Sequence, residues 1–151
     1  MNGTKSETRL IWPGLQGFYD TFFDVAFALM RVAIGYILLR HGLVKVHAGA
    51  AAVAASMTKN GLQPATAFAY AAMALETVGA ACIILGLFTR FFAAALAVEI
   101  GIAFLFVHLP KGFAASQGGY EYVLLIGIVL LAIAIRGGGP YSVDRLIGRE
   151  L

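Results

Sequence analysis

The chain has 151 residues, of which 60% are hydrophobic and 13% are charged, with a formal net charge of +3. Soluble domains carry about 25% charged residues, so this composition excludes an ordinary soluble domain and indicates a membrane protein. The basic residues are spread over the ends of apolar segments, which argues against a nucleic-acid partner and for contact with lipid headgroups. The single cysteine, Cys82, excludes thiol–disulfide chemistry by one chain, because that chemistry needs an attacking and a resolving thiol.

Four apolar stretches are about as long as a membrane-crossing helix requires, which is about 20 residues. They cover residues 23–44, 65–88, 91–109 and 120–135. The last stretch is short and needs tilt or local thinning of the bilayer to cross it. The connection at Thr89 and Arg90 is so short that the second and third stretches must form an antiparallel hairpin. We therefore predict an all-α integral membrane protein, an antiparallel four-helix bundle.

The segments around these spans predict three regions. Residues 1–21 end in aromatic side chains typical of the membrane interface and form an N-terminal interfacial segment. Residues 22–146 form the four-helix domain, and residues 147–151 form a C-terminal tail. Between the first two spans, the alanine-rich residues 48–57 predict a short amphipathic or re-entrant helix.

The positive charges outside the spans predict the orientation. With four spans both termini lie on one side of the membrane. The terminal side then holds six basic residues: Lys5, Arg9, Arg90, Arg136, Arg145 and Arg149. The opposite side holds four: Arg40, Lys45, Lys59 and Lys111. The positive-inside rule places the larger number, and so both termini, in the cytoplasm.

Three charged residues lie deep inside the apolar stretches: Arg31, Glu76 and Glu99. A charge at the bilayer centre costs roughly 2.5–3.5 kcal/mol on insertion scales, so such residues pair inside the bundle or serve a site. We predict an ion pair between Arg31 and Glu76, whose depths match best. One arginine cannot neutralise two glutamates, so the second is protonated, hydrated, paired with a bound ligand or paired with another basic group.

A second polar cluster is predicted where the spans meet the non-cytoplasmic surface. His41 and Lys45 end the first span, His108 ends the third and Glu121 starts the fourth. We predict that these four residues bind a small ligand, with a quinone as the favoured one. His108 follows Glu99 by nine residues, half a turn out of phase in a regular helix, so these two side chains are not expected to face the same way.

Other cofactors are weaker hypotheses. His41 and His108 lie at similar depth, which permits a haem between them but indicates nothing more. Glu76, Glu99, His108 and Glu121 offer a carboxylate–histidine metal site, but no haem, flavin or metal motif of fixed spacing is present. The cofactor therefore stays unassigned at this point, apart from the quinone hypothesis.

Taken together and in order, several short motifs give the chain a family resemblance. They are Arg31–Gly35, His41–Gly42 with Lys45, Gly61–Leu62 before Pro64, Glu76–Gly79, Gly86–Arg90, His108 with Gly112–Phe113, Gly119–Tyr122, and Gly137 and Gly139 followed by Tyr141–Asp144. Over about residues 25–146 the chain resembles the DoxX family of small four-helix membrane proteins. Pro140 departs from the pattern, which often has a basic residue there. The resemblance implies a prokaryotic plasma-membrane protein related to the membrane subunit of a thiosulfate:quinone oxidoreductase.

Three functions from different classes are compatible with these features. The first is a quinone-interacting or membrane-anchoring subunit of a redox system, with a soluble or membrane redox partner. The second is a transporter or channel for a small polar solute, and the third is an assembly or scaffold protein, for instance a homo-oligomer. A scaffold needs no surplus carboxylate, and transporters usually show repeats or broken helices that this sequence lacks. The redox function is therefore the first hypothesis, and whether the chain is itself catalytic stays open.

Overall fold

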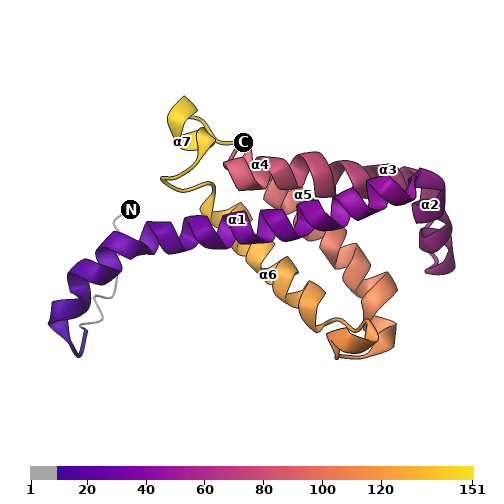
Figure 1. Ribbon diagram of the computed structural model, residues 1–151, viewed down its shortest axis with the longest axis horizontal. Coiled ribbons are helices and arrows are strands. Elements are labelled where there is room, and N and C mark those ends of the chain that lie inside the picture. Colours follow the sequence, from indigo (N-terminus) through magenta and orange to yellow (C-terminus); the bar gives the residue numbers. More distant parts are fainter. Residues whose placement is uncertain (1–9) are drawn as a thin grey trace.

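The computed structural model describes residues 10–151 and consists of helices joined by short turns (Figure 1). Residues 1–9 lie outside the described residues, and with them Lys5, Arg9 and the start of the predicted interfacial segment. A short 3-10 turn, η1 (Pro13–Leu15), leads into α1 (Gln16–Ala48), which runs unbroken through the predicted boundary at residue 21. The predicted short helix between the first two spans is confirmed as α2 (Ala50–Lys59).

The second and third spans each contain a π-helical turn. The second consists of α3 (Ala65–Ala74), the π-helix η2 (Leu75–Gly79) and α4 (Ala80–Leu85). The third consists of α5 (Thr89–Ala103), the π-helix η3 (Phe104–His108) and the 3-10 turn η4 (Leu109–Lys111). A further turn, η5 (Ala115–Gln117), precedes α6 (Glu121–Arg136), and α7 (Val143–Ile147) follows near the C-terminus.

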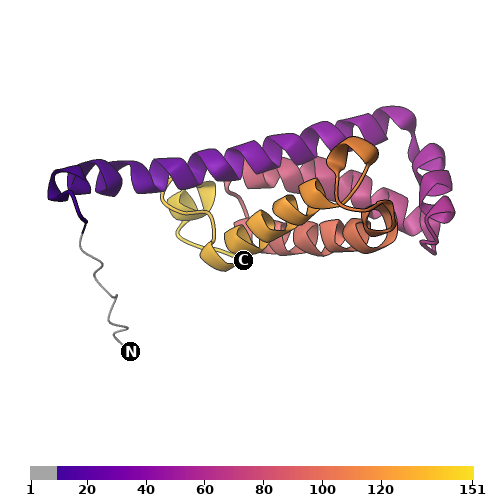
Figure 2. The same ribbon diagram turned by 90° about the horizontal axis from the view of Figure 1, so that it is seen from below.

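These elements form the predicted all-α antiparallel bundle. Three helices are long and apolar enough to cross a membrane: Pro13–Ala48, Ala65–Leu85 and Thr89–Lys111. The fourth, α6, has 16 residues and is about 24 Å long at 1.5 Å per residue, shorter than the roughly 30 Å hydrocarbon core. The 33 residues of α1 span about 50 Å by the same rise, and its N-terminal end projects past the other helices (Figures 1 and 2).

Glycines fix how α1 packs against the second span. A Cβ on Gly35 would lie 2.7 Å from Ile84 Cγ1, and a Cβ on Gly42 would lie 2.5 Å from the backbone of Glu76. Small residues at such positions let helix backbones approach closely. The two contacts fix an antiparallel register in which Gly42 faces Glu76 and Gly35 faces Ala80 and Ile84. The α5–α6 pair packs beneath, with Leu96, Leu130 and Ile133 fully buried in the shared core.

At the opposite end from α2, the C-terminal segment clamps the turn between the second and third spans. Ser142 caps α7, with its Oγ accepting a hydrogen bond from the Arg145 N–H. Asp144 lies in the first turn of α7 and is 1% exposed, and its carboxylate binds the turn between the second and third spans. It accepts hydrogen bonds from Phe88 N at 2.7 Å, Thr89 N at 2.9 Å and Thr89 Oγ1 at 2.6 Å. An acid from the end of the chain thus supplies the N-terminal cap of α5.

Replacing Asp144 with alanine removes this cap. Each buried donor left without a partner costs about 1–3 kcal/mol, and three donors lose their acceptor, so the Tm of Asp144→Ala in detergent should fall well below that of the wild type. Asp20→Ala is the matched control, because Asp20 is exposed and accepts only from Gln16 one turn away. Equal Tm values for the two variants would contradict the clamp.

Candidate functional site

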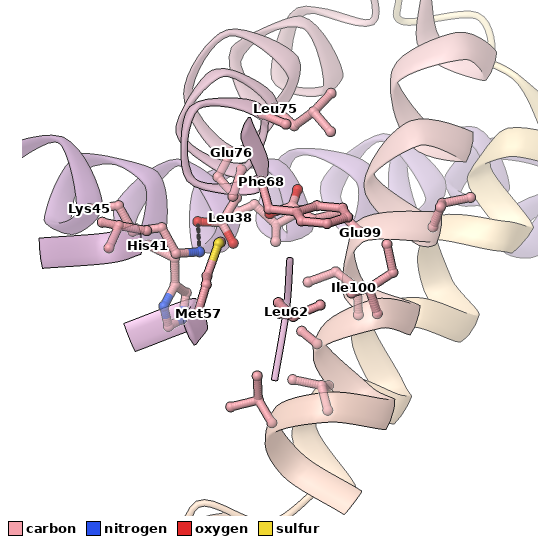
Figure 3. A pocket seen from close by; sticks show the side chains of 18 of the residues that line it. Leu38, His41, Lys45, Met57, Leu62, Phe68, Leu75, Glu76, Glu99 and Ile100 are labelled. Atoms are coloured by element: carbon pink, nitrogen blue, oxygen red, sulfur yellow. Dashed lines mark hydrogen bonds and ion pairs between the residues drawn. The ribbon is translucent and has the colours of Figure 1, made fainter. Parts of the chain in front are cut away.

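A cavity of about 480 Å³ lies between the C-terminal half of α1, α2 and the other three spans. Most of its wall is apolar, and its acidic, basic and histidine side chains come from several elements: Lys45 and His41 of α1, Glu76 of η2, Glu99 of α5 and His108 of η3. In Figure 3, His41, Lys45 and Met57 lie on one side, Glu99 and Ile100 lie on the other, and Glu76 and Phe68 lie between them. The cavity has the apolar wall and few convergent polar groups typical of small-molecule sites.

The ion pair of this cavity joins Lys45 Nζ to Glu76 Oε2. The predicted Arg31–Glu76 pair is therefore wrong. The reason is the register of α1: Gly42 faces Glu76, which puts Lys45 one turn farther on in reach of its carboxylate. Arg31 lies 14 residues before Lys45, about 21 Å away along the helix. Only 5% of the Glu76 side chain is exposed, compared with 31% for Lys45.

The side chain of Arg31 instead binds the C-terminal end of the second span. Its Nη1 donates to the carbonyls of Ile83 at 2.5 Å and Ile84 at 2.9 Å, and its Nη2 donates to the carbonyl of Tyr141 at 2.5 Å. A cation that binds the last carbonyls of α4 satisfies groups that have no partner within the helix. Arg31 is 2% exposed, so it joins α1, α4 and the C-terminal segment into one buried unit and takes no part in the cavity.

Glu99 is the second carboxyl of the cavity and forms no ion pair with any residue between 10 and 151. Its Oε2 atom is buried and forms no hydrogen bond with any residue between 10 and 151. The side chain lies within electrostatic range of Glu76 and Lys45. The sequence predicted two buried glutamates against one basic residue, Arg31. In the structure the two glutamates line the cavity with Lys45, which is the one lysine or arginine among the lining residues.

The two π-helical turns bring side chains to the cavity that regular helices would turn elsewhere. Glu76 is the second residue of η2, and His108 is the last residue of η3. The expectation that Glu99 and His108 face different ways is wrong, because both line the cavity. The wider turn of η3 rotates the chain by fewer degrees per residue and so changes the phase between them. Such turns inside α-helices occur frequently at functional sites.

The predicted ligand site is brought together only in part. His41, Lys45 and His108 all line the cavity, and Nδ1 of His108 donates to the carbonyl of Gly118 at 2.7 Å. Glu121 is not among the lining residues. Its Oε1 accepts a hydrogen bond from Ala115 N at 2.8 Å, because the loop before α6 folds back over the start of that helix. No three His, Cys, Asp or Glu side chains between residues 10 and 151 gather as a metal site requires.

Several lining residues could not be found from sequence patterns. Val53, Ser56 and Met57 of α2 and Asn60 after it cover the outer side of the cavity. The predicted helix at residues 48–57 was the one signal that pointed to this cover, but its depth and tilt depend on packing. Tyr122 also lines the cavity, from the first turn of α6.

A double-mutant cycle tests the pairing of Lys45. Lys45→Met and Glu76→Gln should each lower the Tm, and the double variant should lose less than the sum, with a coupling of about 0.5–3 kcal/mol. Arg31→Met combined with Glu76→Gln should be additive, because Arg31 donates only to carbonyls. Additivity in the first cycle together with coupling in the second would restore the Arg31–Glu76 pair.

Comparison with known proteins agrees with this architecture. Residues 26–109, which are 84 of the 151 residues, match the DoxX family. An uncharacterized protein of Haemophilus influenzae is 32% identical over 121 residues, which cover 78% of this chain and 87% of that protein. A second uncharacterized protein of the same organism is 33% identical over 86 residues, 57% of each chain. No solved structure gives a significant match. The chain belongs to the DoxX family.

Proposed function

We propose that this protein is a quinone-interacting subunit of a redox system in a prokaryotic plasma membrane. The observation that carries the proposal is the cavity of about 480 Å³ at one end of the bundle. Its volume falls within the roughly 300–1,000 Å³ of small-molecule sites. A lipid-soluble ligand reaches such a cavity from the bilayer, and its apolar wall suits a ring with an isoprenoid or alkyl tail.

The polar groups of the cavity match a ligand that alternates between carbonyl and hydroxyl. A quinone carbonyl accepts hydrogen bonds, and Lys45 has three N–H donors, of which the Glu76 pair uses one. His41 offers a second donor on the same side. Since a carbonyl only accepts, the bond from His108 to Gly118 puts its proton on Nδ1, and Nε2 of the neutral ring is then an acceptor for a quinol hydroxyl.

The resemblance to the membrane subunit of a thiosulfate:quinone oxidoreductase supports a partner protein as the source of electrons, with this chain as the quinone-binding anchor. The count of basic residues supports cytoplasmic termini, and a cytoplasmic partner would then meet the end that carries α7 and the clamp at Asp144. The cavity would lie toward the outer leaflet.

Orientation is tested by labelling single cysteines in a Cys82→Ser background. Lys59→Cys at the end of α2 and Arg149→Cys after α7 both place the thiol at exposed positions. A membrane-impermeant maleimide applied to intact cells should label Lys59→Cys, and it should label Arg149→Cys only after permeabilisation. Labelling of Arg149→Cys alone in intact cells would show that the protein has the opposite orientation.

Quinone binding is tested by thermal shift of the detergent-solubilised protein. A ligand that binds only the folded state stabilises it by RT ln(1 + [L]/Kd), so ubiquinone-1 or menadione should raise the Tm in a concentration-dependent way. His41→Ala should weaken the response at least several-fold. His47→Ala is the matched control, since His47 bonds the Leu43 carbonyl and does not line the cavity. No response to either quinone in the wild type would favour the transporter or scaffold hypothesis.

A further inference from the structure

The cavity holds two carboxyl groups but one lysine, so one of the carboxyls has no basic partner among the lining residues. Lys45 is bound to Glu76, and the other ion pairs between residues 10 and 151 join Arg90 to Glu150 and Arg136 to Asp24. Arg31 is held by three carbonyls about 21 Å along α1 from Lys45. Glu99 therefore faces the cavity with a buried carboxyl oxygen that no described residue satisfies.

A neutral quinone does not supply a positively charged hydrogen-bond donor to Glu99. Leaving a buried polar group without a hydrogen bond costs free energy, and leaving a buried charge without a counterion costs more. A quinone carbonyl only accepts hydrogen bonds, and a quinol hydroxyl donates one but brings no charge to balance the two carboxyls. The group that satisfies Glu99 is a donor, and a positively charged donor also balances the two carboxyls against one lysine.

The rest of the wall selects which cation fits. Ala95, Ile100 and Ala103 lie on the same helix as Glu99 and give its neighbourhood an apolar surface. The aromatic rings of Phe68 and Tyr122 also line the cavity, and aromatic faces attract ammonium groups. In Figure 3, Phe68 lies beside Glu99 at the wall. A strongly hydrated metal ion would lose its water shell against such a wall, whereas an ammonium on an apolar body would not lose comparable solvation.

We propose that the cavity binds lipophilic organic cations, with a protonated amine donating to Glu99 and its apolar body in contact with Phe68 and the apolar wall. This inference goes beyond quinone binding and does not depend on it. Because both ligands would occupy the same 480 Å³, an organic cation would also exclude a quinone from the cavity.

The test compares two probes that share a skeleton and differ in charge. 1-Benzylpiperidine is protonated at pH 7, and 1-benzoylpiperidine is its neutral amide. Thermal shifts of the detergent-solubilised full chain are measured with each probe. The amine should raise the Tm and the amide should not, and Glu99→Gln should weaken the apparent affinity for the amine at least tenfold. Glu121→Gln is the matched control, because Glu121 lies at the same end of the bundle and does not line the cavity.

Each result decides the proposal. Equal responses to amine and amide, or an amine response unchanged in Glu99→Gln, would mean that the cavity binds apolar bodies without the carboxyl, and would overturn it. No amine response in the wild type would overturn it as well. If Glu99→Gln does not fold, Glu99→Asp keeps the carboxyl and withdraws it by one methylene, and should bind the amine more weakly than the wild type. A quinone response without an amine response refutes this inference alone, and the reverse refutes the proposed function alone.

Discussion

The contact between α1 and the second span at Gly35 and Gly42 determines the rest of the molecule. Because these glycines lack a Cβ, the α1 backbone lies against Glu76 and Ala80, and the side-by-side position of the two helices is fixed along their whole length. That register assigns a partner to each buried charge of α1. Lys45 meets Glu76 at the cavity, and Arg31 meets the last carbonyls of α4 at the opposite end. A side chain at either glycine would separate both sets of groups.

The sequence was sufficient for the architecture and for the identity of the polar residues, but not for their pairing. Long apolar stretches and the short Thr89–Arg90 connection predict the helices because both signals are local. The Arg31–Glu76 error came from judging depth within each apolar stretch separately. Depth within a stretch does not fix the sliding of one helix along another, and here α1 extends well past its apolar part. Register is a property of two surfaces in contact, and one sequence pattern does not contain it.

The same limit applies to the cavity. His41, Lys45 and His108 were predicted to converge because they end neighbouring antiparallel helices, and this argument needs only chain direction. Glu99 and His108 were expected to face different ways because the prediction assumed a regular helix, and η3 breaks that regularity. Glu121 was included because it starts α6, but its carboxylate bonds the preceding loop instead. Irregular turns and local side-chain bonds arise from packing of the whole bundle, so they do not follow from spacing.

The clamp at Asp144 has a mechanical consequence for the cavity. Glu76 and Glu99 lie on the two arms of one hairpin, and Asp144 holds the turn at Phe88 and Thr89 where the arms meet. From Thr89 to Glu99 the arm is about 15 Å long at 1.5 Å per residue. A rotation of that arm by about 5° at the turn would move the Glu99 backbone by about 1.3 Å at this radius. The hydrogen bonds of Asp144 at this turn therefore help to fix the distance between the two carboxyls of the cavity.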